Sequence, residues 1–140
     1  MSEVKTTDAP RVLRILFVDD CPDTISSMQT LCKLLGFDSL GVKNGLAAIQ
    51  VAREFRPDIV IMDIAMPQLN GYEAARLIRN LDRGEDIVLV AMTGHGEETY
   101  KKRAWDAGFN HYWLKPVNFD LLRGLFTASQ KDKQRVPAAS

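Results

Sequence analysis

The sequence predicts an α/β domain with a doubly wound, five-stranded parallel sheet and helices on both faces. Short apolar runs alternate along the chain with segments of helical periodicity, and polar residues directly follow several of the runs. Runs of Val, Ile and Leu without alternation are typical of strands covered on both faces. Strands that alternate with helices favour a parallel sheet, and right-handed crossovers narrow the topology to a doubly wound one.

The predicted strands are the apolar runs, of which the first, third and fourth are richest in Val, Ile and Leu. They are expected at 12–18, 37–42, 58–62, 87–91 and 109–114. The segments between them repeat apolar residues at three-four spacing, and the first three end at or before Gly36, Pro57 and Gly84. The helical patterns occupy 25–35, 46–55, 74–81, 97–107 and 121–126, and the fourth is the most polar.

Length and charge indicate one ordinary globular domain. We expect it at 11–129, with a flexible N-terminal segment at 1–10 and a polar tail or linker at 130–140. The chain has 18 basic and 18 acidic residues, so its formal net charge of zero argues against a nucleic-acid or membrane surface.

Neither cysteine shows a metal-binding or disulfide pattern, so Cys21 and Cys32 are expected to be reduced thiols. No apolar run reaches the ~18 residues of a membrane span, and the N-terminus lacks an apolar signal core. These observations predict a cytoplasmic protein.

Polar groups end four of the predicted strands. Asp19 and Asp20 follow the first, Asp63 the third, Thr93 the fourth and Lys115 the fifth. Ligands of doubly wound folds bind outside the carboxyl ends of the strands, where these groups would meet. Three crowded carboxylates repel one another unless a cation holds them, which points to a divalent metal.

Four sequence motifs carry a family resemblance. They are VDD at 18–20, MDIAMPQLNG at 62–71, TG at 93–94 and KP at 115–116. In this order and at these strand ends, the chain resembles the receiver domain of two-component response regulators, of the chemotaxis-regulator type, over about residues 11–129. The resemblance implies the flavodoxin-like strand order 2-1-3-4-5.

The resemblance also implies a chemistry. Asp63 would be the phosphoacceptor, and Mg²⁺ would be held by Asp19, Asp20, Asp63 and the backbone carbonyl of Ala65. The donor would be the phosphohistidine of a histidine kinase or of a histidine phosphotransfer protein. The chain would then be a signalling domain rather than an enzyme with a separate substrate, although it would catalyse its own phosphorylation and autodephosphorylation.

Three further residues receive roles from the resemblance. Lys115 would pair with Asp63 at rest and with a phosphoryl oxygen afterwards, next to a cis bond to Pro116. Thr93 would be the switch hydroxyl, with Gly94 leaving room for the phosphoryl group. Tyr112 would be the aromatic switch, although a buried sheet aromatic is the competing interpretation. The switched face would be the fourth helix, the fifth strand and the fifth helix.

The loops around this edge carry finer expectations. Met66–Pro67 and Gly71 would shape the loop after Asp63, with the glycine permitting a tight entry into the third helix. Ala65 and His95 depart from common usage in the family, and both would tune the lifetime of the phosphoryl group. His95 and His111 lack the paired spacing of metal ligands.

The same residues argue against three other functions. A pseudo-receiver, used only as an interaction module, would lack one of the five groups, and none is missing. A Mg²⁺-dependent hydrolase or nuclease needs a base or a basic groove, which the sequence does not show. An FMN-binding flavodoxin relative is disfavoured because two aspartates occupy the loop where a phosphate needs backbone N–H groups.

The surroundings of the domain stay open at this point. A stand-alone regulator and a receiver from a hybrid sensor kinase or multidomain regulator both fit, and the run at 107–126 resembles receivers of hybrid kinases. A downstream effector or an intramolecular kinase domain would be the further partner, without nucleic-acid binding or membrane insertion.

Overall fold

The computed structural model describes residues 12–64, 71–94 and 98–134. Its strands form one five-stranded sheet of order β2-β1-β3-β4-β5, in which every neighbouring pair is parallel. The strands are β1 (Arg14–Val18), β2 (Asp38–Val42), β3 (Ile59–Asp63), β4 (Val88–Thr93) and β5 (His111–Leu114). The fold class and the strand order predicted above are confirmed.

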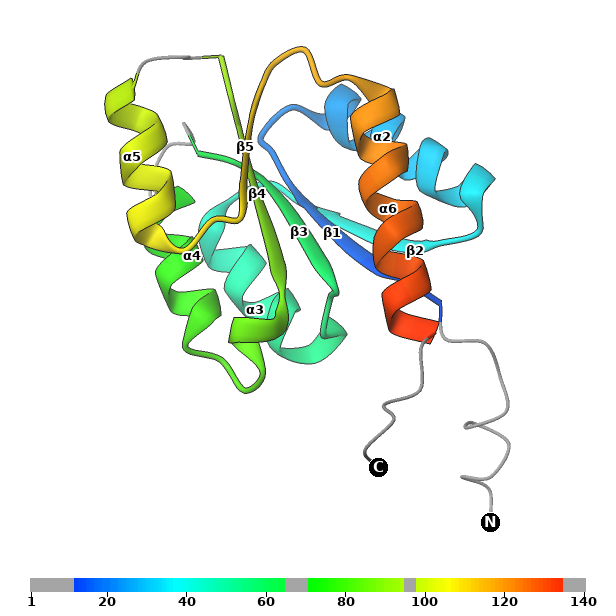
Figure 1. Ribbon diagram of the computed structural model, residues 1–140, viewed down its shortest axis with the longest axis horizontal. Helices are drawn as coiled ribbons and strands as arrows, with labels where there is room; N and C mark the ends of the chain where they lie inside the picture. The colour runs from blue at the N-terminus through cyan, green and yellow to red at the C-terminus, as the bar shows by residue number, and fades with distance from the viewer. Residues whose placement is uncertain (1–11, 65–70, 95–97, 135–140) are drawn as a thin grey trace.

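The helices cover both faces of the sheet (Figure 1). One face carries α2 (Pro22–Leu35) and α6 (Phe119–Gln134), and the other carries α3 (Gly45–Phe55), α4 (Gly71–Arg79) and α5 (Glu98–Ala107). Each face has its own apolar core. Phe17, Met28 and Phe126 belong to the first core, whereas Leu16, Ile78 and Ala104 belong to the second. None of the helices in the described ranges is long and apolar enough to cross a membrane.

Local sequence signals set the ends of the first two helices. Pro22 occupies the first turn of α2, where its missing N–H leaves no bond unmade. The same helix ends at Gly36, whose φ of 82° is in the left-handed region that glycine tolerates. At the start of α3, Asn44 accepts a hydrogen bond from the amide of Ala47 at 2.8 Å.

The structure differs from the predicted bounds in ways that matter for the site. Strands β3 and β4 extend to include Asp63 and Thr93, so both are the last residues of buried strands rather than loop residues. At the C-terminus, α6 continues to Gln134, so residues 130–134 are helical although a tail was expected there. The side-chain oxygen of Gln130 accepts a hydrogen bond from the amide of Leu13 at 2.8 Å, which ties this helix to the start of the sheet.

One arginine holds together the edge of the sheet opposite the polar groups. Arg79, at the end of α4, donates from Nη1 to the carbonyl of Gly84 at 2.8 Å and from Nε to that of Gly108 at 3.0 Å. Its Nη2 bonds Oδ1 of Asn110 at 2.7 Å, and the same oxygen accepts the amide of Leu89. Burial lowers the pKa of Arg79, and the guanidinium fixes α4, the short 3₁₀ turn η1 (Gly84–Asp86) and the entry to β5.

Candidate functional site

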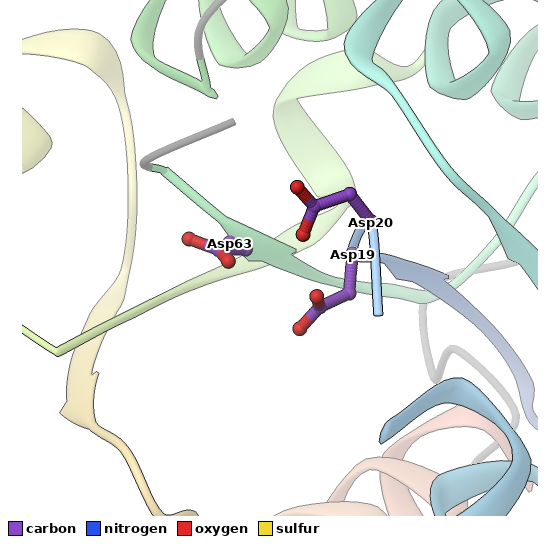
Figure 2. Close-up of side chains that lie close together, drawn as sticks. All are labelled: Asp19, Asp20 and Asp63. Carbon is purple, nitrogen blue, oxygen red and sulfur yellow. The ribbon is translucent and has the colours of Figure 1, made fainter. Parts of the chain in front are cut away.

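The three aspartates meet at the carboxyl edge of the sheet (Figure 2). Parallel pairing sets Val18 beside Met62, so the residues that follow them, Asp19 and Asp63, lie on adjacent strands. Carboxylate oxygens of Asp19, Asp20 and Asp63 all lie within 4.8 Å of one another. Asp19 and Asp63 are buried, at 1% and 7% exposure, whereas Asp20 faces solvent.

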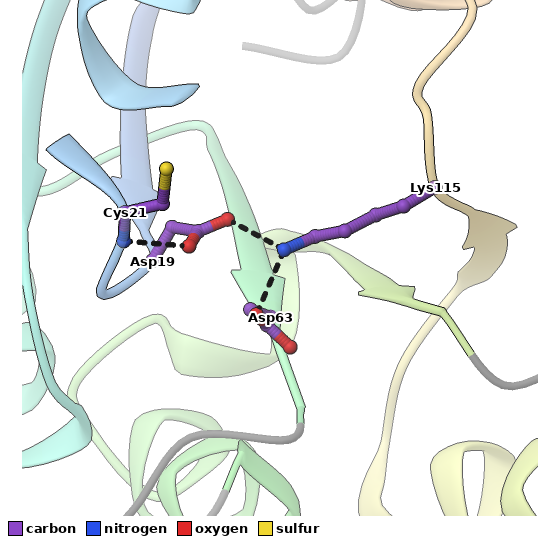
Figure 3. A network of polar contacts seen from close by, with 4 residues as sticks. All are labelled: Asp19, Cys21, Asp63 and Lys115. Carbon is purple, nitrogen blue, oxygen red and sulfur yellow. Dashed lines mark hydrogen bonds and ion pairs between the residues drawn. The ribbon is translucent and has the colours of Figure 1, made fainter. Parts of the chain in front are cut away.

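Lys115 bridges two of these carboxylates (Figure 3). Its Nζ lies 2.9 Å from Oδ2 of Asp63 and 3.0 Å from Oδ2 of Asp19. Burial alone would lower the pKa of Lys115, but the bonds to Asp63 and Asp19 outweigh it and raise the pKa. The contact with Asp63 matches the sequence-based expectation, whereas the contact with Asp19 has no counterpart in it.

Backbone contacts fix Lys115 at this point. Its amide donates to the carbonyl of Thr93 at 2.8 Å, which extends the pairing of β4 and β5 by one residue. The bond from Lys115 to Pro116 is cis, as the resemblance implies. The two ion pairs show that the side chain points from the sheet edge toward the acidic cluster (Figure 3).

Asp19 is oriented by the start of α2. The amide of Cys21 donates to Oδ1 of Asp19 at 2.9 Å, while Oδ2 faces Lys115 (Figure 3). This hydrogen bond was not predicted from the sequence, because every residue except proline carries a backbone N–H and the residue type alone does not mark this one as a donor. The signal was nonetheless present, since an Asp commonly accepts a hydrogen bond from the backbone amide two residues further on, which here belongs to Cys21, just before α2.

The two expected switch residues lie on neighbouring strands. Thr93 is 1% exposed at the end of β4, and Tyr112 is partly buried in β5, where it packs against the core beneath α3, α4 and α5. At the next residue, a Cβ added to Gly94 would meet no atom within 4 Å apart from its chain neighbours. Tyr112 thus also fits the competing interpretation of a sheet aromatic.

Among the residues expected to shape the loop after Asp63, the structure describes Gly71. Gly71 begins α4, and a Cβ there would lie 2.6 Å from Cα of Ile64, the residue after Asp63. The tight entry expected at this glycine is therefore a close backbone approach. Ala65, Met66, Pro67 and His95 lie outside the described residues. His111 stands beside Trp113, with ring centroids 5.9 Å apart, and away from the acidic cluster.

The donor set fits a hard divalent cation. Three carboxylates and one ammonium give the cluster a formal charge of −3 + 1 = −2. Oxygen ligands and this charge suit Mg²⁺, which prefers carboxylates and retains several waters. The same charge excludes binding of a free anion unless a cation comes with it.

Comparison with known proteins identifies the family. The family model described as the response regulator receiver domain matches residues 15–127. Protein PilH of Pseudomonas aeruginosa is 34% identical over 109 residues, covering 78% of this chain and 90% of PilH. The sensor histidine kinase GacS of Pseudomonas protegens is 32% identical over 120 residues, covering 84% of this chain but only 13% of GacS.

Solved structures agree. The receiver domain of sensor histidine kinase PA1611 from Pseudomonas aeruginosa, solved with a magnesium ion coordinated in the active site cleft, superposes with a TM-score of 0.77 at 27% identity. The match covers 86% of this chain and 99% of that domain. Together with the acidic cluster at the carboxyl edge of a 2-1-3-4-5 sheet, these matches show that the chain belongs to the response regulator receiver family of two-component signalling.

Proposed function

We propose that this receiver accepts a phosphoryl group on Asp63 from the phosphohistidine of a histidine kinase or of a histidine phosphotransfer protein, with Mg²⁺ as cofactor. The observation that carries the proposal is the convergence on Asp63. Its carboxylate ends a buried strand, contacts Lys115 at 2.9 Å and lies beside two further acids.

The reaction follows from these positions. An oxygen of Asp63 attacks the phosphorus, the new P–O bond forms, and the P–N bond to the donor imidazole breaks. The imidazole nitrogen leaves with the electron pair of that bond. Asp19, Asp20, Asp63 and the carbonyl of Ala65 would hold Mg²⁺, which would neutralise charge on the transferred phosphoryl group. Lys115 exchanges its bond to Asp63 for one to a phosphoryl oxygen, where its raised pKa keeps it charged.

The donor needs a route to Asp63. A groove of about 510 Å³ lies beside Lys115, between α2 and the segment that leads into α6. It is lined by Thr24, Ser27, Met28, Lys115, Pro116, Val117 and Phe119. Its lining is mostly apolar side chains and small hydroxyls, and Phe119 is 49% exposed. We place the helix that carries the donor histidine in this groove, because an occupant there lies next to the acceptor.

The output is a shift between two conformations. Thr93 would bond a phosphoryl oxygen, and Tyr112 would turn into the space that the threonine leaves. The face formed by α5, β5 and α6 would respond, and its exposed Trp105, Leu114 and Leu121 offer apolar contact to a partner. Moving an equilibrium from 1:99 to 99:1 takes about 5.5 kcal/mol, which several charge-assisted bonds to a phosphoryl group can supply.

The wider setting forms part of the same proposal. We place the receiver unit at 11–129 in the cytoplasm, with a kinase or effector domain as its further partner. A phosphorylation-independent interaction module is the alternative, and no lost group at the described site favours it.

The proposal is tested by Mg²⁺-dependent phosphorylation with acetyl phosphate and by binding of beryllofluoride, a phosphoryl analogue. The wild type should take up the label or the analogue only with Mg²⁺, and Asp63→Asn should take up neither. Asp106→Asn, at an exposed acid of α5, is the matched control and should behave as the wild type. Equal uptake by Asp63→Asn, or no uptake by the wild type, would overturn the proposal.

A further inference from the structure

The described side chains of helix α5 bury little apolar surface in the core. Between Tyr100 and Ala107, only Ala104 and Ala107 are buried, and alanine removes little apolar area from water. Trp105, the largest side chain of the helix, is 44% exposed. Contacts supplied by neighbouring elements must therefore contribute much of what holds α5 against the sheet.

Tyr72 supplies such contacts from α4. It is 5% exposed and belongs to the same core cluster as Ala104 and Ala107. Its hydroxyl donates to the backbone carbonyl of Tyr100, near the start of α5, at 3.3 Å. The guanidinium carbon of Arg103 lies 4.3 Å from the centre of the Tyr72 ring, within the range of a cation–π interaction.

The position of Tyr72 along the chain gives these contacts a consequence. It follows Gly71, where an added Cβ would lie 2.6 Å from Cα of Ile64, the neighbour of Asp63. The contact therefore joins the helix that follows the phosphoacceptor in the chain to the helix expected to move.

We infer that Tyr72 is a positioning residue that holds α5 in its resting place through the carbonyl of Tyr100 and the side chain of Arg103. The inference rests on the proposed function in so far as α5 moves on phosphorylation. Because an analogue that favours the moved position must overcome this contact, a contact that stabilises the resting position lowers the affinity for a phosphoryl analogue by up to the same factor. Loosening it should raise that affinity.

Tyr72→Phe tests the hydrogen bond while keeping the ring, and Arg103→Gln tests the cation. A typical hydrogen bond of about 1 kcal/mol corresponds to about a fivefold effect, and a cation–π contact to about a threefold effect. Amide hydrogen exchange in α5 of the ligand-free protein should quicken by these factors. Beryllofluoride with Mg²⁺ should bind tighter by up to the same factors. Arg123→Gln, at an exposed arginine of α6, should change neither.

The two readouts separate the inference from the proposed function. Hydrogen exchange needs no phosphoryl analogue, so unchanged α5 exchange in Tyr72→Phe overturns the inference whatever the binding result. Weaker beryllofluoride binding by Tyr72→Phe also overturns it, because a variant that merely damages the fold would behave in that way. If the wild type fails to bind beryllofluoride, the proposed function falls, and the exchange rates still decide whether Tyr72 holds α5.

Discussion

Lys115 donates a hydrogen bond to Asp19 over 3.0 Å, across 96 positions of the chain. The ammonium thus lies between two of the three carboxylates of the acidic cluster. Its positive charge offsets the repulsion between them.

Replacing Lys115 by Gln should therefore strengthen Mg²⁺ binding. The cluster changes from a formal charge of −2 to −3, and a competing cation is lost. A charge at this partly exposed position acts with an energy on the order of 1–2 kcal/mol, so we expect about a tenfold gain in affinity. Isothermal titration with Mg²⁺ measures it, with the exposed Lys131→Gln as control. A weaker Mg²⁺ affinity would contradict the assigned role.

Gly71→Ala should destabilise the protein. The new Cβ would lie 2.6 Å from Cα of Ile64, and backbone cannot move aside as a side chain would. Overpacking of this kind costs about 1–3 kcal/mol of unfolding free energy. Urea denaturation measures the loss.

A second glycine provides the matched control for this substitution. Gly124 lies inside α6 with nothing within 4 Å of an added Cβ, so Gly124→Ala should stabilise the fold by about 0.5–1 kcal/mol. Equal effects of both substitutions would show that helix propensity, rather than the approach to Ile64, decides the outcome at Gly71.

Arg79→Lys should weaken the fold although it keeps the charge. A lysine cannot reach the carbonyls of Gly84 and Gly108 and the side chain of Asn110 together, because it lacks the planar fork. Each of the two part-buried carbonyls costs up to about 1–3 kcal/mol when it loses its donor. Arg76→Lys, on the exposed side of the same helix, should leave thermal unfolding unchanged. If both variants had the same melting temperature, Arg79 would not have the structural role assigned to it.

Cys32 should make stability depend on pH in the alkaline range. Burial raises the pKa of its thiol to about 12. The unfolded thiol ionises near its ordinary value of 9.0, so the folded state binds more protons between these values and loses stability as pH rises. The loss approaches about 1.4 kcal/mol per pH unit above the ordinary value.

The comparison of variants isolates this contribution from other alkaline groups. Urea denaturation at pH 7, 9 and 10 should show that the stability gap between the wild type and Cys32→Ala shrinks with pH. The exposed Cys21→Ala should show no such shrinking gap, because a hydrogen bond with Thr24 lowers the pKa of the Cys21 thiol instead of raising it. A gap that stays constant for Cys32→Ala would mean that its thiol ionises freely in the folded protein.

The pattern of apolar residues predicted the architecture. A strand that is covered on both faces needs apolar residues at successive positions, as in β3, where all five residues are buried. It also predicted the meeting of Asp19, Asp20 and Asp63, because parallel strands bring their carboxyl ends to one edge. The finer contacts of the site could not be predicted from the sequence. The bond from Lys115 to Asp19 depends on side-chain direction, which residue order does not encode.

Arg79 shows the same limit at the opposite edge. In the sequence it is a basic residue in the last turn of a helix, where favourable interaction with the helix dipole is the ordinary explanation. Its bonds to Gly84, Gly108 and Asn110 join segments that only the fold brings together. The end of α6 is a further case, since the polar composition after residue 129 hides a helix that Gln130 anchors.

The hydrogen bond between Leu13 and Gln130 joins the start of the sheet to the last helix. It lies at the start of β1, whereas Asp19 and Asp20 follow the end of the same strand. Five residues of extended strand separate the two ends by about 16 Å. A segment joined before β1 or after α6 would therefore start at the edge of the sheet opposite the aspartates, and the acidic edge would stay accessible.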